Sequence, residues 1–159
     1  MDGVQWMYGF EPDSMSIEWK ERVRKLFLDE TGEAYTIDSI SNLQVPEWKG
    51  NLLLIDPEEY PNASSLLGVM WALPHEEHGV RIAAFVIDAS QQSDGWGSKA
   101  WQHLVEICRA EGKKFIQLEV KAENVRAQKF YRLRGLEVIR ELKHYYASGL
   151  GLEMKGPVQ

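Results

Sequence analysis

Hydrophobic residues in much of the chain gather in short runs of strand length, separated by residues that favour turns. Runs bounded by glycine, proline, asparagine or aspartate are typical of buried or half-buried strands. Strands are predicted at Val4–Phe10, Asn51–Ile55, Leu66–Leu73, Val80–Ile87, Phe115–Val120 and Leu136–Leu142, with a last short strand within Gly151–Gln159. Residues 155–159 are expected to form a loose tail.

Other segments show helical spacing of their apolar residues. The clearest covers residues 96–111 and ends before Gly112. Its apolar face comprises Trp101, Leu104, Val105 and Cys108. Ser16 is placed to cap an earlier helix, whose apolar positions are Ile17, Val23, Leu26 and Phe27. Asn124 is placed to cap a later helix that runs to Gly135.

The order of these elements predicts a mixed fold. Residues 31–50 are irregular, with a short helix expected near residues 36–43. A crossover helix joins Val80–Ile87 to Phe115–Val120, so these two strands should be parallel neighbours. The expected class is α/β or α+β, in a single domain over residues 1–159.

Composition narrows the function classes. A net charge of −6 and a pI near 5.3 disfavour nucleic-acid binding, which needs a basic face, and mildly favour a cationic acceptor such as an amine. There is no apolar run of membrane-spanning length, and Met1-Asp-Gly lacks the pattern of a secretory signal. The single cysteine, Cys108, excludes an internal disulfide and fits a reducing compartment, so a cytoplasmic protein with no membrane partner is expected.

The most informative segment is Gln92-Ser-Asp-Gly-Trp-Gly-Ser98, between a predicted strand and the clearest helix. Two glycines at the start of a helix let the backbone approach a ligand closely. The helix start also presents unpaired amides and a partial positive charge, which suit a phosphate. A phosphate-bearing cofactor is therefore expected near residues 92–98.

Two other interpretations of this loop remain open. Gly95-Trp-Gly-Ser-Lys-Ala100 also fits the dinucleotide pattern G-x-G-x-x-A, with Glu119 as the ribose-binding acid. Against it, residues 89–94 separate the strand from the first glycine, and only about 60 residues follow, too few for the usual six-stranded sheet. The loop could also be a plain strand-to-helix turn. A Walker motif is absent, and His75-Glu-Glu-His78 does not match H-E-x-x-H, so no metal site is expected.

Several motifs together resemble the GNAT acetyltransferases. Gln92-x-x-Gly95-x-Gly97 resembles their pyrophosphate loop, and Arg81–Asp88 resembles the strand before it. The resemblance spans about residues 66–155. Its second half lies in Leu118-Glu119-Val120, Asn124, Ala127, Phe130-Tyr131 and Gly135-Leu136. His144-Tyr145-Tyr146 and Leu152-Glu153-Met154 are similar to a narrower branch, the RimI-like protein N-terminal acetyltransferases. Where many family loops have a basic residue just before the first glycine, this chain has Asp94, with Ser93 before it.

The resemblance implies a GNAT fold and its chemistry. The expected fold is a mixed, mostly antiparallel sheet of about six to seven strands with about four helices, splayed at one parallel pair. The implied activity is direct transfer of acetyl from acetyl-CoA to a primary amine, with a protein or peptide N-terminal α-amine as the expected acceptor and no metal. A small-molecule amine acetyltransferase and a non-catalytic acyl-CoA-binding domain are the alternatives.

The resemblance also assigns roles to residues. Tyr131 is the expected acid for the departing thiolate and Glu119 the base, acting through water; the alternatives are a packed core tyrosine and a salt-bridged structural acid. The cofactor-binding set is Phe85, Val86, Ile87, Gln92, Ser93, Asp94, Gly95, Trp96, Gly97, Ser98, Asn124, Ala127 and Tyr131. Within it, the backbone of Phe85–Ile87 would supply oxyanion donors.

Two further groups of side chains are assigned less specific roles. Tyr145 and Tyr146 would border the acceptor groove, unless they only pack across the sheet. A basic patch comprises Lys121, Arg126, Lys129, Arg132 and Arg134. This patch is interpreted mostly as a solvated helix surface, and one of its residues could contact the cofactor's 3′-phosphate.

Overall fold

A mixed β-sheet organises the chain, which a computed structural model describes over residues 3–146 and 149–158. Within these residues, seven strands lie in the order β1-β2-β3-β4-β5-β7-β6. The strands are β1 (Gln5–Tyr8), β2 (Asn51–Ile55), β3 (Leu66–His75), β4 (Gly79–Ile87), β5 (Phe115–Lys121), β6 (Glu137–Tyr146) and β7 (Gly149–Pro157). The helices are α1 (Ile17–Thr31), α2 (Ile37–Ser41), α3 (Trp96–Ala110) and α4 (Val125–Arg132), with short 3₁₀ turns at Pro12–Ser14, Ala63–Ser65 and Ala89–Gln91.

One neighbouring pair in the sheet is parallel. β4 and β5 run side by side in the same direction, joined by α3, and the other neighbouring pairs are antiparallel. This confirms both the predicted parallel pair and the expected mostly antiparallel mixed sheet. A six-stranded parallel dinucleotide fold, the alternative considered for the glycine loop, does not fit this topology.

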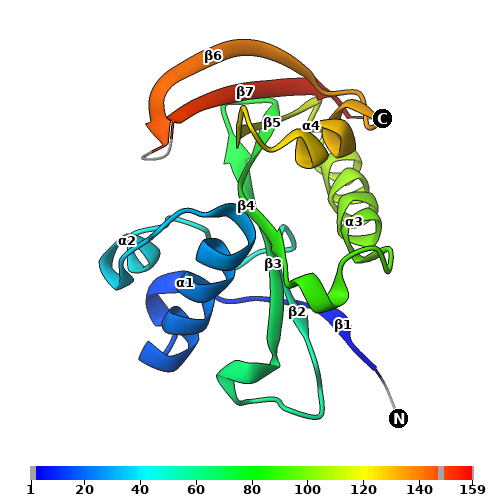
Figure 1. Cartoon of the computed structure of the whole chain (residues 1–159). Helices are drawn as coiled ribbons and strands as arrows, with labels where there is room; N and C mark the ends of the chain where they lie inside the picture. The colour runs from blue at the N-terminus through cyan, green and yellow to red at the C-terminus, as the bar shows by residue number, and fades with distance from the viewer. Residues whose placement is uncertain (1–2, 147–148, 159) are drawn as a thin grey trace.

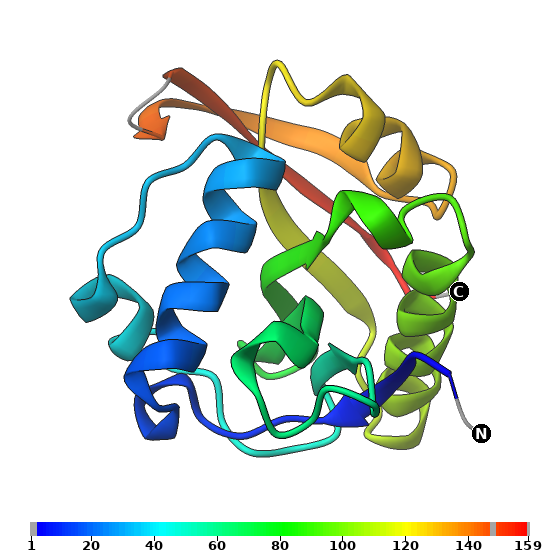
Figure 2. The ribbon, with the colours of Figure 1, turned by 60° about the horizontal axis from the view of Figure 1, so that its bottom comes forward.

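The helices cover the two faces of the sheet, as Figures 1 and 2 show, with α1 and α2 on one side and α3 on the other. One core, under α1 and α2, includes Trp19, Val23, Leu26, Phe27, Ile40, Leu53, Val69 and Trp71. The other, under α3 and α4, includes Trp101, Leu104, Val105, Cys108, Tyr131, Leu52, Met70, Ile116 and Leu118. Neighbouring strand residues such as Leu52 and Leu53 therefore enter opposite cores, as strand alternation requires.

Partway along strand β4, the alternation of its side chains between the two cores is reversed. Its register against β3 skips Ala83, because Trp71 pairs with Ala84 and Ala72 pairs with Ile82. Ile82 belongs to the core under α3 and α4, whereas Ala84 belongs to the core under α1. The extra residue is a β-bulge, which bends a strand and re-aims the side chains that follow.

The parallel pair separates just after this bulge. Ladder pairs between β4 and β5 run from Gly79↔Phe115 to Ile82↔Leu118. Both strands continue beyond that point, to Ile87 and Lys121, with no further pairs between them in the described part of the chain. The sheet is therefore splayed at its centre, as the fold resemblance implied.

Most predicted elements are confirmed, with different ends. The caps at Ser16 and Asn124 form, each side chain accepting a bond from the amide three residues on. β6 extends past the expected end at Leu142 as far as Tyr146. No helix among the described residues has the length and apolar character needed to cross a bilayer.

The expectation of a loose tail from residue 155 is wrong for the described residues. Residues 155–157 belong to β7 and pair with Phe115–Gln117 of β5, and the Val158 amide donates to the Lys114 carbonyl. Backbone pairing, which needs no apolar pattern, holds this segment in the sheet. Gln159, also assigned to the tail, lies outside the described residues.

Gly156 tests whether this last segment contributes to stability. A Cβ at Gly156 would overlap the carbonyl of Gly135, which is backbone and not the end of a flexible side chain. We expect Gly156→Ala to lower the free energy of unfolding by about 2–3 kcal/mol in urea titrations, the scale of overpacking at a rigid site. Gly3→Ala, where a Cβ meets no atom within 4 Å, is the control. Equal stability of the two variants would contradict a packed C-terminal strand.

Candidate active site

The glycine loop leaves the end of α3 open to a ligand. Ser93 and Gly95 both have left-handed backbones, with φ of 69° and 85°. Gly95 is the N-cap residue of α3, and no side chain caps this helix. The first amides of α3 are thus available to an anion, which the helix dipole also favours.

A cavity of about 530 Å³ lies against this loop. It is lined by the end of α1, the end of β4, the loop and the first two turns of α4. All the residues predicted to bind the cofactor line it except Asp94, which is exposed. Sequence reasoning did not include Glu30, Thr31, Gln91, Arg126 and Phe130 in this set, although they also line the cavity. Arg126 had been noticed only as part of the basic patch.

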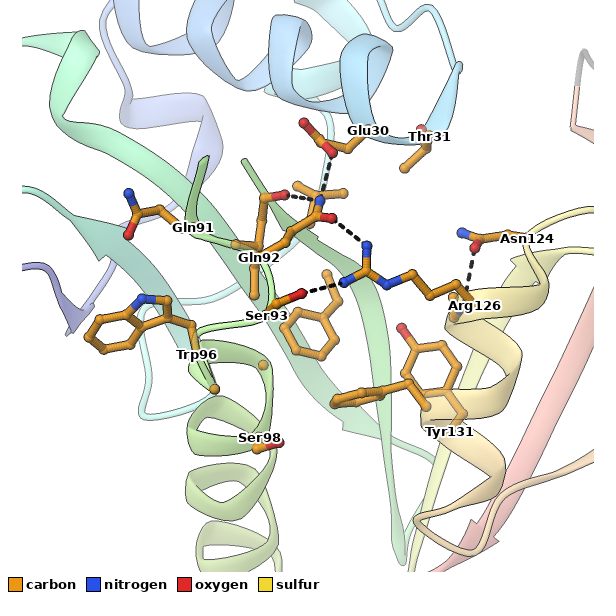
Figure 3. A pocket seen from close by; sticks show the side chains of 17 residues that line it. Glu30, Thr31, Gln91, Gln92, Ser93, Trp96, Ser98, Asn124, Arg126 and Tyr131 are labelled. Atoms are coloured by element: carbon orange, nitrogen blue, oxygen red, sulfur yellow. Dashed lines mark hydrogen bonds between the residues drawn. The ribbon is translucent and has the colours of Figure 1, made fainter. Parts of the chain in front are cut away.

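A continuous chain of hydrogen bonds crosses this cavity, shown in Figure 3. The Gln92 side-chain amide donates to a Glu30 carboxylate oxygen at 2.7 Å and to the Ile87 carbonyl at 2.8 Å. The Gln92 amide oxygen accepts from Arg126 at 2.6 Å, and the Ser93 hydroxyl lies 3.5 Å from the same guanidinium. The loop is therefore tied to β4, to α1 and to α4.

These groups fit the diphosphate and pantetheine parts of coenzyme A. Arg126 is the single cationic side chain among the residues that line the cavity, and Glu30 is the single anionic one. Free amides and a guanidinium suit phosphate oxygens. The rings of Phe85 and Phe130, whose centroids are 5.9 Å apart, form an aromatic wall that suits an apolar arm. Asn124 lines the cavity while its side chain caps α4, so its two predicted roles are compatible.

Tyr131 lies between this cavity and a second, smaller one of about 100 Å³. Figure 3 shows its hydroxyl directed into the space between the loop and α4. The ring packs on Trp101 and Phe130, and among the described residues no group bonds the phenol oxygen. Burial raises the pKa of Tyr131 well above its usual value, only partly offset by the charge of Arg134. The phenol is therefore a proton donor at every ordinary pH.

The second cavity opens between the separated ends of β4 and β5. The two cavities share Thr31, Phe85, Val86, Asn124, Ala127 and Tyr131. After Ile82, β4 has no ladder partner in β5 among the described residues, so amides on that side are available to a ligand. This arrangement agrees with the prediction of oxyanion donors in Phe85–Ile87, which stays a prediction.

Glu119 lines the second cavity and forms an ion pair. One of its carboxylate oxygens accepts from Arg81 Nε at 2.9 Å and from a terminal nitrogen of the same guanidinium at 2.6 Å. Tyr145 donates to the same oxygen at 3.2 Å. Although burial alone would lower the pKa of Arg81, the hydrogen bonds and charge of Glu119 raise it. Both the predicted site role and the salt-bridged alternative are thus compatible with this geometry.

A second ion pair lies at the other side of the cavity. Lys121 Nζ is 2.7 Å from a Glu33 carboxylate oxygen and donates to the Thr31 carbonyl. Both side chains are nearly buried, at 8% and 11% exposure. The inclusion of Lys121 in a solvated basic patch was therefore wrong, because α1 and the loop after it cover this end of β5.

The two tyrosines of β6 extend over the same cavity. Tyr146 lines it, and its ring lies 6.0 Å from Lys121 Nζ and 4.9 Å from the Tyr145 ring. Burial raises the pKa of both tyrosines and the Glu119 charge raises it further, while Arg81 partly offsets the rise for Tyr145. The prediction that they border the acceptor groove thus agrees with their position, and they also pack on each other.

The other candidate residues lie in ordinary structural environments. His75 and His78 each face a neighbouring glutamate in the turn between β3 and β4. No group of three or more metal-ligating side chains occurs among the residues the structure describes. Cys108 is buried in the core, and burial raises the pKa of its thiol to about 11, so it is a poor nucleophile.

Comparison with known proteins agrees with this geometry. A family model described as the acetyltransferase (GNAT) family matches residues 20–136. Ard1 from Thermoplasma volcanium superposes with a TM-score of 0.78 at 22% identity, over 99% of each chain. No curated protein sequence matches the chain significantly.

Two further solved structures share the fold. The ribosomal-protein-S18-alanine N-acetyltransferase from Escherichia coli gives a TM-score of 0.73 at 16% identity, over 98% of this chain and 94% of that one. Arabidopsis thaliana Naa50, in complex with the bisubstrate analogue CoA-Ac-MVNAL, gives a TM-score of 0.68 at 16% identity, over 97% of this chain and 98% of that one. The family match covers most of the chain and confirms the predicted enzyme class, an acetyl-CoA-dependent N-acetyltransferase. The chain belongs to the GNAT family of acetyltransferases.

Proposed function

We propose that this protein transfers the acetyl group of acetyl-CoA to the α-amino group of a peptide or protein N-terminus, by direct attack within a ternary complex. Two cavities that meet at Tyr131 support a ternary complex, because cofactor and acceptor can be bound together. The buried Cys108 offers no route through a covalent intermediate. Residues 1–159 act as one domain in this proposal, in a cytoplasmic setting that suits an unpaired cysteine.

The observation that most favours an α-amine is the charge balance of the acceptor cavity. Its two carboxylates, Glu33 and Glu119, are each already paired with a cation, Lys121 and Arg81. Such a site gives little net attraction to an ammonium ion, so an amine that readily loses its proton is preferred. At pH 7.5 roughly a third of α-amines are neutral, against roughly one lysine side chain in a thousand.

The residues around the junction have complementary roles in this proposal. Tyr131 protonates the departing thiolate, and free amides of β4 stabilise the oxyanion. Glu119 accepts the amine proton through water, using the carboxylate oxygen that Arg81 and Tyr145 leave available. Tyr145 and Tyr146 form the wall along which an extended N-terminus lies.

Similar proteins support a peptide acceptor. Besides the Naa50 complex, a NatC complex bound to Gag peptide and CoA shares the fold, with a TM-score of 0.75 at 18% identity. These likenesses concern the fold, and the charge balance of the smaller cavity supports the α-amine as acceptor independently of them.

A panel of acceptors tests the proposal directly. We expect thiol release from acetyl-CoA to be at least about tenfold faster, in kcat/KM, with a free N-terminal peptide than with the same peptide blocked at its N-terminus and containing a lysine. A small primary amine serves as the third arm. Comparable rates with the lysine peptide or the small amine would overturn the α-amine assignment. Binding of CoA without turnover on any acceptor would instead favour a non-catalytic domain.

Replacement of Tyr131 tests the acid role. We expect Tyr131→Phe to lower kcat by about 10²-fold or more while KM for acetyl-CoA changes little, because the ring packing on Trp101 and Phe130 is kept. Since the pKa of Tyr131 is raised and the acid form is the active one, wild-type kcat should not fall with rising pH below about pH 10. A descending limb below about pH 9, or full turnover by the variant, would contradict this role.

Kinetics can distinguish a role of Glu119 as the base from a purely structural role. We expect Glu119→Gln to lower kcat by about 10²-fold with a largely unchanged Kd for CoA, since the amide keeps the shape but loses the base. Glu137→Gln removes a charge from an exposed carboxylate of β6 that lines neither cavity, and it is the matched control. If the Glu119 variant kept normal kcat and lost only stability, Glu119 would be a structural acid.

A further inference from the structure

Arg126 occupies an unusual position for a residue that a sequence places on a solvated helix surface. It belongs to the first turn of α4, yet its guanidinium reaches across the larger cavity to the glycine loop. There it donates to the Gln92 amide oxygen at 2.6 Å and approaches the Ser93 hydroxyl at 3.5 Å. The side chain therefore spans the space between the loop and α4 that a ligand must enter.

The partners of Arg126 do not match its chemistry. A guanidinium presents a planar fork of donors that suits the paired oxygens of a phosphate or carboxylate. Both of its present partners are neutral, and the one anion of the cavity, Glu30, is instead bonded to Gln92 and to the Ala89 amide. Arg126 is thus a cation in the cavity that has no anionic partner among the described residues.

The loop offers no other cation that could take this role. The residue before Gly95 is Asp94, which is exposed and does not line the cavity. Two other basic residues of this region have partners of their own: Arg134 donates to the Ser98 hydroxyl and the Phe130 carbonyl and lies over the Phe130 ring, and Lys99 lies over the Trp96 ring. Phosphate charge entering this cavity would therefore meet helix amides and Arg126.

We propose that Arg126 is the cationic ligand of the cofactor's phosphates, and that its guanidinium exchanges the side-chain oxygens of Gln92 and Ser93 for phosphate oxygens when the cofactor binds. Gln92 keeps its bonds to Ile87 and Glu30 in this exchange, so the loop stays anchored to β4 and α1. The inference rests on the proposed function, because it assumes that coenzyme A occupies the cavity.

The test compares ligands that differ only in their phosphates. Calorimetry would measure Kd for coenzyme A and for 3′-dephospho-coenzyme A with wild-type protein, Arg126→Gln and Arg126→Lys. We expect Arg126→Gln to weaken coenzyme A binding by about 10- to 100-fold and to reduce its sensitivity to salt, with partial recovery in Arg126→Lys, which keeps the charge but not the fork. A loss that persists with the dephospho ligand assigns the contact to the diphosphate, and a loss that disappears assigns it to the 3′-phosphate.

S-acetyl-pantetheine and a matched variant complete the design. This truncated donor has no diphosphate, so acetyl transfer from it should be the same in wild type and Arg126→Gln. Arg132→Gln makes the same change later in α4, at an exposed residue that does not line the cavity, and should leave every Kd within about twofold. Circular dichroism would check that each variant is folded.

The outcomes separate this inference from the proposed function. Equal Kd for coenzyme A in wild type and Arg126→Gln, or an equal loss in Arg132→Gln, would overturn the role of Arg126. A loss of transfer from S-acetyl-pantetheine equal to the loss with acetyl-CoA would overturn it too, because no phosphate is involved. Failure of the wild type to acetylate any amine would remove the proposed function, while the Kd comparison would still decide the phosphate contact.

Discussion

The separation of β4 from β5 is the constraint on which the site depends. The bulge at Ala83 bends β4 at the point where its pairing with β5 ends, so the two strands diverge toward Ile87 and Lys121. The smaller cavity opens in this gap, the larger one lies against the end of β4 and the glycine loop, and Tyr131 lines both. The same bulge turns Phe85 toward Phe130 and the cofactor side, whereas an unbroken alternation would have turned it toward α1.

The two cavities differ in the charged groups that line them. The cofactor side presents positive charge at the glycine loop, from an uncapped helix N-terminus and Arg126, while its one lining carboxylate, Glu30, is bonded to Gln92 and to the Ala89 amide. The acceptor side has two cations and two carboxylates in close pairs. An anionic ligand is thus favoured in one cavity, and a ligand without net charge in the adjacent one.

The sequence predicted those features that depend on local pattern. Strand runs, the caps at Ser16 and Asn124 and the crossover rule were enough to place β4 and β5 as parallel neighbours and the glycine loop at the start of α3. The bulge could not be predicted, since Val80, Ile82, Ala84 and Val86 read as one uninterrupted alternation although they enter different cores. Contacts between residues distant in sequence could not be predicted either. The sequence around Gln92 does not indicate Glu30 as its partner, and the sequence around Glu119 does not indicate Arg81.

The two ion pairs of the smaller cavity also connect the β6–β7 hairpin to β4 and β5. Tyr145 donates to the oxygen of Glu119 that Arg81 binds, and Tyr146 lies over Lys121, which is paired with Glu33 beyond the end of α1. The aromatic wall and the charged floor are therefore one bonded unit built from α1, β4, β5 and β6. Moving either tyrosine would therefore alter the surroundings of a buried or half-buried ion pair. The placement of the Glu119 carboxylate and the position of the β6–β7 hairpin are for this reason coupled.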